Sequence, residues 1–394
     1  MIRAFGVCMG LLGLLALSDA QNRLAQERRD GFRPLFNGRN LQGWKVYAGA
    51  EWRVQNGELI GPTDSAGWIG TAETFDNFIL RGEYWIDKGD THESNSGVFF
   101  RAQPTATPWN DGYEMQISLQ DERNPTGSIY NRVPTHLTRM REIAPERQWN
   151  AFEIRACGSH IQITINGEMV QDCDLHEFQR GVIGLQQHHP GVTVKYRNLR
   201  IKRLQACDEG WQPLFNGKDL SGWFATGMAR WSVRDGVIVG EGGMGHLFTE
   251  QTFTDFELRA MIRIRPFREN SPMNPNNGIY FRAQPNPENR NNWPVGYEAQ
   301  VYNHIGRGDY ITGSLYGRVM ASRLLTRDGD WFSMRVRAQG DHIQIFVNGQ
   351  KVVDTRNSDF KSGHIALQCH DPFTIIETRD IYWRRLSEHS EAYK

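Results

Sequence analysis

Short stretches of alternating apolar and polar residues run along the whole chain. Glu153–Ala156 and Ile161–Ile165 both alternate in this way, which is typical of a strand with one buried face. Asn166-Gly167 follows, and both residues tolerate the positive φ angles of a type I′ hairpin turn. The same device returns in His342–Val347 with Asn348-Gly349. Beyond the N-terminal segment no stretch of ten or more residues shows convincing helical periodicity, so the pattern predicts an all-β protein of antiparallel strands.

The whole pattern is present twice. Leu35-Phe36-Asn37-Gly38 returns as Leu214-Phe215-Asn216-Gly217, and later motifs repeat in the same order. The repeated unit, which runs from Leu35 to the return of the motif at Leu214, is too long for a solenoid repeat and has the usual size of an independent domain. We therefore predict two tandem antiparallel β-sandwich or jelly-roll domains, at residues 31–204 and 210–387, with a linker at residues 205–209.

The N-terminus has the composition of a targeting segment. Arg3 precedes an apolar run over residues 4–17, and small and polar residues follow up to Ala20. This run is shorter than the roughly 20 apolar residues of a membrane span, and its pattern is typical of a secretory signal peptide. We expect residues 1–20 to be that peptide, residues 21–30 and 388–394 to be terminal segments, and the mature protein to be secreted or periplasmic, with no membrane span.

Charge and cysteine content narrow the choice of partners. The 45 Lys and Arg residues balance 45 Asp and Glu residues, so no basic field favours nucleic acid and neutral partners fit best. The cysteines after residue 20 lack the close paired spacing of zinc sites. Export permits disulfides, and Cys157 with Cys173 is the obvious pair within one domain.

Strand alternation sorts the polar residues that both copies share. In residues 95–101, Asn95 and Arg101 fall on the face opposite Val98 and Phe100. The polar residues that this parity assigns to one face are Asn95, Arg101, Glu114, Gln116, Gln186 and His188 in the first copy, and Asn276, Arg282, Glu298, Gln300, Gln368 and His370 in the second. Solvent alone does not require the same residue types to return, so we interpret this face as a polar groove, although each arginine could instead be a structural ion-pair partner of the glutamate.

Aromatic residues divide into core and loop candidates. Trp44, Trp52 and Trp149 match tryptophans of the second copy and fit a sandwich core best. Trp109 and Trp293 lie in loops rich in Pro, Asn and Gly, where substrate contact and plain loop packing are equally plausible. The remaining candidates for substrate binding are Tyr130, Arg132, His304, Tyr316 and Arg318.

These motifs together resemble a known family. The order Leu-Phe-Asn-Gly, Asn-Ser-Gly-Val-Phe-Phe-Arg, Gly-Tyr-Glu-x-Gln, Thr-Gly-Ser-x-Tyr and Gly-x-Ile-Gly-Leu-Gln-x-His is similar to that of the 3-keto-disaccharide hydrolase domain. The resemblance covers about residues 31–204 and 210–387. It implies a concanavalin A-like jelly roll of exported bacterial proteins that act on glycosides whose C3 hydroxyl has been oxidised to a ketone.

That substrate class suggests a reaction. A C3 ketone acidifies the C2 hydrogen, so a base could remove it while the C1 substituent leaves, and water could then add, for a net hydrolysis. In this hypothesis His188 or His370 is the base, and Arg101 or Arg282 stabilises the enolate. Glu114 or Glu298 could orient the histidine, bind sugar hydroxyls or act as the base itself. An ordinary glycosidase needs two carboxylates, whereas one recurs per groove. We predict no definite cofactor, although a divalent cation could replace the arginine; no metal motif is recognisable in the sequence.

Two other functions stay open. A non-catalytic, lectin-like tandem module would need amides and an aromatic platform but no tuned base, and fold alone does not decide between binding and catalysis. The copies could also be structural modules that dock on each other or on a partner. If the protein is an enzyme, one copy could be catalytic and the other a binding module; His304 favours the second copy as the active one.

Overall fold

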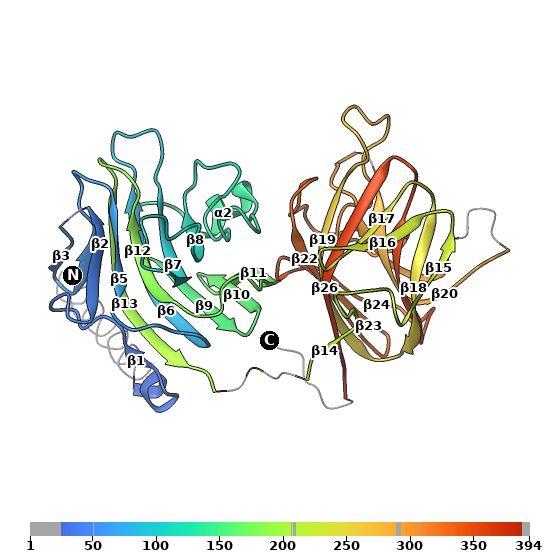
Figure 1. The fold of residues 1–394 in the computed structure, drawn as a ribbon, viewed down its shortest axis with the longest axis horizontal. Coiled ribbons are helices and arrows are strands. Elements are labelled where there is room, and N and C mark those ends of the chain that lie inside the picture. The colour runs from blue at the N-terminus through green and yellow to red at the C-terminus, as the bar shows by residue number, and fades with distance from the viewer. Residues whose placement is uncertain are drawn as a thin grey trace, which may run out of the picture.

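The protein consists of two antiparallel β-sandwiches, drawn in blue to green and in yellow to red in Figure 1. The computed structural model describes residues 25–49, 51–205, 207, 210–288, 293–306 and 308–387. The prediction of an all-β chain with two tandem sandwich domains is confirmed. The predicted signal peptide lies outside the described residues. No helix in the described ranges is long and apolar enough to cross a membrane.

The sandwich of the first domain is built from an eight-stranded and a five-stranded sheet. The larger sheet has the order β11 (Glu168–Asp174), β10 (His160–Ile165), β9 (Asn150–Cys157), β6 (Phe78–Asp87), β13 (Thr193–Arg203), β4 (Glu58–Ile60) and β3 (Arg53–Gln55), and β1 (Arg33–Pro34) pairs with β13. The smaller sheet has the order β2 (Trp44–Gly49), β5 (Gly67–Thr71), β12 (Val182–Gln187), β7 (Ser96–Ala102) and β8 (Tyr113–Ile117). A short helix, α2 (Leu137–Ile143), lies between β8 and β9 along the chain.

The second domain repeats this topology strand for strand. Its larger sheet has the order β16 (Arg230–Arg234), β17 (Val237–Glu241), β26 (Thr374–Arg385), β19 (Phe256–Pro266), β22 (Phe332–Gln339), β23 (His342–Val347) and β24 (Gln350–Arg356), and β14 (Gln212–Pro213) pairs with β26. Its smaller sheet has the order β15 (Trp223–Gly227), β18 (Gly245–Phe253), β25 (Gly363–Cys369), β20 (Asn277–Gln284) and β21 (Val295–Val301). The duplication seen in the sequence is therefore a duplication of a complete fold.

The core of each domain fills the space between its two sheets. In β6 every second residue is buried, as the alternating pattern requires for a strand with one face on the core. Asn166 and Gly167 have φ angles of 50° and 84°, and Asn348 and Gly349 have φ angles of 48° and 77°, so both predicted hairpin turns are present. Their residues lie between β10 and β11 and between β23 and β24.

The two domains meet along β11, which contacts β19, β22 and β24 of the second domain. Among the described residues, three ion pairs cross this interface: Arg259 with Asp174 at 3.1 Å, Arg335 with Asp172 at 3.4 Å, and His176 with Asp380 at 2.7 Å. Burial alone would raise the pKa of Asp172, but the hydrogen bond from His160 and the charge of Arg335 hold it well below its usual range. Paired charges thus occupy the junction of the domains.

The predicted disulfide is wrong, because Cys157 is bonded to Cys207 rather than to Cys173. Cys157 lies on β9 opposite His160 of β10, while Cys173 lies on β11 opposite Ile161 of β10. One strand therefore separates the two cysteines, at about twice the interstrand spacing of 4.7–4.9 Å, which is beyond disulfide reach. Cys207 comes from the linker, so the disulfide fastens the start of the linker to the first domain.

Candidate functional site

Seven matched side chains line a cleft in each domain, on the face of the five-stranded sheet that points away from the core. The first cleft has a volume of about 170 Å³ and the second about 410 Å³. The matched residues are Asn95, Trp109, Glu114, Gln116, Tyr130, Gln186 and His188 in the first domain, and Asn276, Trp293, Glu298, Gln300, Tyr316, Gln368 and His370 in the second. The structure thus brings together most of the residues that the sequence assigned to one groove.

Strand alternation explains how these side chains reach the cleft. On β8, Tyr113 and Met115 are part of the core, so Glu114 and Gln116 point to the opposite face. The last residues of β12 supply Gln186, and the loop between β7 and β8 supplies Trp109. In the second domain, the matching positions of β21, of β25 and of the loop before β21 supply the side chains of the cleft.

The glutamates are the most unusual groups of the two clefts. Burial raises the pKa of Glu114 to about 8, and its Oε1 has no hydrogen-bond partner among the described residues. Burial likewise raises the pKa of Glu298 to about 8, although hydrogen bonds from Tyr280 and Gln368 act in the opposite direction. A carboxyl group with a pKa near neutrality can exchange a proton with a substrate, which a solvated glutamate does less well.

A glycine makes room for each glutamate. A Cβ atom at Gly97 would lie 1.9 Å from Oε1 of Glu114, and one at Gly278 would lie 2.2 Å from Oε1 of Glu298. Gly97 is opposite Gln116 in the β7–β8 ladder, so it is directly beneath the polar side chains of the cleft. The repeated Asn-x-Gly motif therefore has a physical role, because any larger residue would displace the carboxylate.

The two cleft histidines have different neighbours. Nδ1 of His370 lies 3.0 Å from Oδ2 of Asp371, and its ring lies 5.1 Å from the ring of Trp293. His188 reaches the solvent, but the protein shields part of its ring, and this partial desolvation together with the nearby His189 lowers its pKa. The carboxylate of Asp371 can therefore fix the orientation of the His370 imidazole in the cleft.

The residues beneath the clefts also differ. Copy one has Trp68 and Phe99, whose rings are 5.7 Å apart, where copy two has His246 and Tyr280. The indole of Trp68 is larger than the imidazole of His246, which agrees with the smaller volume of the first cleft, whereas Tyr280 is no smaller than Phe99. Burial lowers the pKa of His246 to about 4, and neither ring nitrogen has a hydrogen-bond partner within the described residues.

Sequence reasoning missed His246 because copy one has no histidine at that position. The pairing of the strands is what indicates its place: His246 is opposite the cleft residue Gln368 in the β18–β25 ladder, as Trp68 is opposite Gln186 in the first domain. Tyr280 shares the parity of Asn276 and Gly278, and it lines the second cleft.

The placement of Arg101 and Arg282 in the groove is wrong. Both have positive φ angles, 50° and 48°, at a shift in register near the end of their strands, and such a bulge reverses the alternation. Each side chain is buried and donates to backbone carbonyls and one side-chain oxygen. The acceptors are Asp76, Asn77, Gly158 and Phe178 for Arg101, and Thr254, Asp255, Gly340 and Phe360 for Arg282. These arginines therefore hold loops together, and burial lowers their pKa.

The other basic candidates are placed unevenly. Arg318 lines the second cleft, with its guanidinium 5.1 Å from the ring centroid of Tyr297 and 3.0 Å from Asp359. Arg132 makes the matching contact with Tyr113 but does not line the smaller first cleft. His304 also lies outside the cleft lining, because its Nε2 pairs with Asp328 at 2.8 Å.

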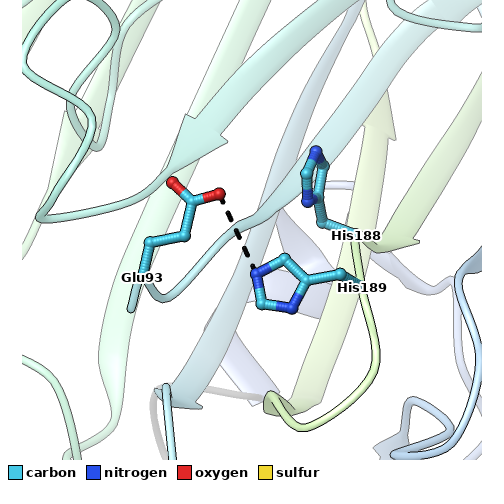
Figure 2. Close-up of side chains that lie close together, drawn as sticks. All are labelled: Glu93, His188 and His189. Carbon is cyan, nitrogen blue, oxygen red and sulfur yellow. Dashed lines mark ion pairs between the residues drawn. The ribbon is translucent and has the colours of Figure 1, made fainter. Parts of the chain in front are cut away.

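A further group of ionisable side chains lies beside the first cleft. Glu93, His188 and His189 each offer a ligand atom within 4.8 Å of the others (Figure 2). Sequence reasoning missed this group because Glu93 and the histidine pair are far apart in the chain. The only local signal was the adjacent pair His188-His189, which copy two does not share.

Comparison with known proteins places the chain in a carbohydrate-related family of β-sandwich domains. The model of the 3-keto-alpha-glucoside-1,2-lyase-like domain matches residues 31–202 and again residues 210–386. The chain therefore belongs to this family and contains two copies of its domain, as the motifs indicated. No curated protein matches it.

Solved structures resemble one domain at a time. A candidate glycosyl hydrolase from Parabacteroides distasonis is 21% identical, with a TM-score of 0.39, and the match covers 45% of this chain and 95% of that chain. The carbohydrate-binding module CBM66 from Bacillus subtilis is 17% identical, with a TM-score of 0.32, over 41% of this chain and 95% of that chain.

Proposed function

We propose that the protein cleaves the glycosidic bond of 3-keto-glycosides, and that the cleft of the second domain performs the reaction. The observation that carries this proposal is the buried Glu298, whose pKa is raised to about 8 by burial, in the same cleft as His370 and Arg318. A site of this kind combines a proton donor, a base and a fixed positive charge, which is more than sugar binding needs. Family membership supports a substrate of the keto-sugar class.

The proposed reaction starts with loss of the proton at C2. The base takes this proton, and the electrons of the C2–H bond form an enolate with the C3 ketone. The enolate then re-forms the ketone while a C1–C2 double bond forms and the C1–O bond breaks, so the aglycone leaves and takes up a proton. Addition of water across the C1–C2 double bond completes a net hydrolysis.

The residues of the second cleft have distinct roles in this scheme. His370, oriented by Asp371, is the proposed base for the C2 proton. Glu298 is largely protonated near neutral pH, so it can donate a hydrogen bond to the oxygen that becomes negative. Arg318 replaces Arg282 as the cation that stabilises the enolate, because it lines the cleft and Arg282 does not.

A binding role is the second candidate, and it fits the first domain best. The first cleft is smaller, lies over a tryptophan and a phenylalanine, and contains the indole of Trp109. Aromatic surfaces and amides suit sugar stacking and hydrogen bonding without chemistry. In this arrangement the first domain would hold a sugar unit while the second domain cleaves one.

The test is release of the aglycone from a 3-keto-glucoside, beside the unoxidised glucoside, by the purified protein. We expect cleavage of the keto form alone, lost in His370→Gln and retained in the matched His188→Gln. Cleavage of neither sugar, with measurable affinity for both, would reject the enzyme and support a binding protein. We also propose that the protein is exported, which the disulfide between Cys157 and Cys207 supports.

A further inference from the structure

We propose that Glu93, His188 and His189 of the first domain form a binding site for a divalent transition-metal ion of the zinc type. The three residues come from two loops, one before β7 and one after β12, and their side chains converge beside the first cleft (Figure 2). This proposal concerns binding of the ion and does not depend on the proposed reaction.

The distances suit a site that closes on its ion. All three ligand atoms lie within 4.8 Å of one another, and Oε1 of Glu93 lies 3.9 Å from Nε2 of His189. Ligands at about 2.0–2.2 Å from a tetrahedral ion are about 3.3–3.5 Å apart. The separations between the ligand atoms therefore need to shorten by at most about 1.5 Å, which side-chain rotation can supply. The ring of His188 lies edge-on to that of His189, with the centroids 5.3 Å apart, and the side chain is exposed, so it has solvent beside it into which it can turn.

His189 is held in the form that a metal ligand requires. Its Nδ1 lies 3.0 Å from the carbonyl oxygen of Pro190, which can only accept a hydrogen bond. The proton of the neutral ring therefore belongs on Nδ1, and Nε2 presents its lone pair towards Glu93. This Nε2 is buried and has no hydrogen-bond partner in the part of the chain that the structure describes. A fixed tautomer with the other nitrogen hydrogen-bonded to a carbonyl is typical of zinc-bound histidines.

The loop that carries Glu93 is also well fixed. Oγ1 of Thr91 donates a hydrogen bond of 2.7 Å to the carbonyl of Glu93, and both the backbone N–H and the hydroxyl of Ser94 bond to Gln120 at 2.9 Å. The carboxylate of Glu93 is itself largely shielded, with 21% of its side chain exposed. The site therefore has an anchored carboxylate and an anchored imidazole, with His188 as the adjustable third ligand.

The donor set selects the class of ion. Two imidazoles and one carboxylate suit zinc and its neighbours, whereas calcium and magnesium prefer oxygen ligands throughout. Three protein ligands also leave one position of a tetrahedral ion open. Because His188 lines the first cleft, that position would be accessible to water or to an oxygen of a bound sugar.

The second domain offers no such site at the matched positions. Asn274 replaces Glu93, His370 replaces His188, and Asp371 replaces His189. The carboxylate of Asp371 is already engaged with the ring of His370 and with the backbone N–H of Phe373. One ion is therefore expected per chain, in the first domain.

The experiment is calorimetric titration of the full, chelator-stripped protein with zinc chloride. We expect one zinc ion per chain, and binding at least about 100-fold weaker in His189→Ala and Glu93→Gln, since even outer-shell changes cost 10- to 100-fold. Asp371→Ala, the matched change in the second domain, should leave affinity within about threefold, as should His92→Ala. His92 is exposed and close to Glu93, so it tests whether any surface histidine suffices.

Two measurements protect this result from misinterpretation. Circular dichroism on heating checks that each variant is folded, and X-ray absorption of the zinc complex should show nitrogen and oxygen neighbours only. A sulfur neighbour would assign the ion to a cysteine and overturn the proposal. Unchanged affinity in both His189→Ala and Glu93→Gln, loss of binding in Asp371→Ala or His92→Ala, or no zinc binding by the native chain would also overturn it.

Discussion

The two domains keep the same cleft side chains but differ in what surrounds them. In the second domain the hydroxyl of Tyr280 reaches Glu298, and His246 is adjacent; in the first domain Phe99 and Trp68 take these places. Residues shared between the copies thus define a common polar surface, whereas residues that differ decide which groups contact the glutamate and the histidine of each cleft. Repetition alone is therefore a poor guide to which copy performs chemistry.

Arg101 and Arg282 show that a residue shared by both copies need not belong to the cleft. Arg101 and Arg282 are kept in both copies, and each makes the same set of hydrogen bonds to loop carbonyls. Hydrogen bonds to a charged donor contribute about 1.5–3 kcal/mol each, so their loss would destabilise either domain. A polar residue can be retained in two copies for the sake of the fold, without any contact with a ligand.

The largest expected difference between the domains concerns their glutamates. Glu298→Gln should lower kcat/KM for a 3-keto-glucoside by about 10²- to 10⁴-fold, the usual range for a lost acid–base group. Glu114→Gln should change it by less than about threefold, because Glu114 lacks the donors that position Glu298. Steady-state kinetics of the two variants check this. Equal losses would show that both clefts are active, and a larger loss for Glu114→Gln would reverse the assignment.

The disulfide should separate the stabilities of the domains. Replacing Cys157 and Cys207 together by serine opens a loop with a sequence separation of 50 residues. The chain-entropy relation gives a loss of about 4 kcal/mol for a loop of this length. Urea unfolding followed by hydrogen exchange should locate the loss in the first domain. A total loss under about 1 kcal/mol, or a loss in the second domain alone, would contradict the expectation.

Dependence on pH should be shared by the two domains. The folded state raises the pKa of Glu114 and Glu298 from 4.5 to about 8, so it binds protons that the unfolded state has released. Their contribution to stability is therefore complete below pH 4.5 and is lost as pH rises through 8, by up to about 1.4 kcal/mol per pH unit for each carboxyl. Urea unfolding from pH 5 to 9 measures this slope. Glutamine at both positions should flatten it; an unchanged slope would assign the effect to other groups.

The smallest expected effect belongs to His304. Because its ring pairs with Asp328 outside the cleft lining, His304→Ala should change kcat/KM by less than about threefold. The free energy of unfolding should fall by less than about 1 kcal/mol, as for other partly exposed ion pairs. Kinetics and thermal unfolding of this variant check both values. A large loss of activity would restore His304 to the site.

Much of the fold could be predicted from local patterns. Alternation and the two Asn-Gly turns identified strands and hairpins because side-chain direction and turn geometry depend on residues close in sequence. The same parity placed Glu114, Gln116, Gln186 and their counterparts on one face. It failed at Arg101 and Arg282, because a bulge depends on how a strand pairs with its neighbours rather than on its own composition.

The sequence by itself determined the duplication, the all-β class and most of the polar residues of each groove, since repeats and period-two patterns are local properties of the chain. Only the tertiary structure decided the disulfide partner, the raised pKa of the glutamates, and the meeting of Glu93 with His188 and His189. These features depend on burial and on distances between segments that are remote in sequence. Such distances are set by the packing of whole sheets, which no local pattern records.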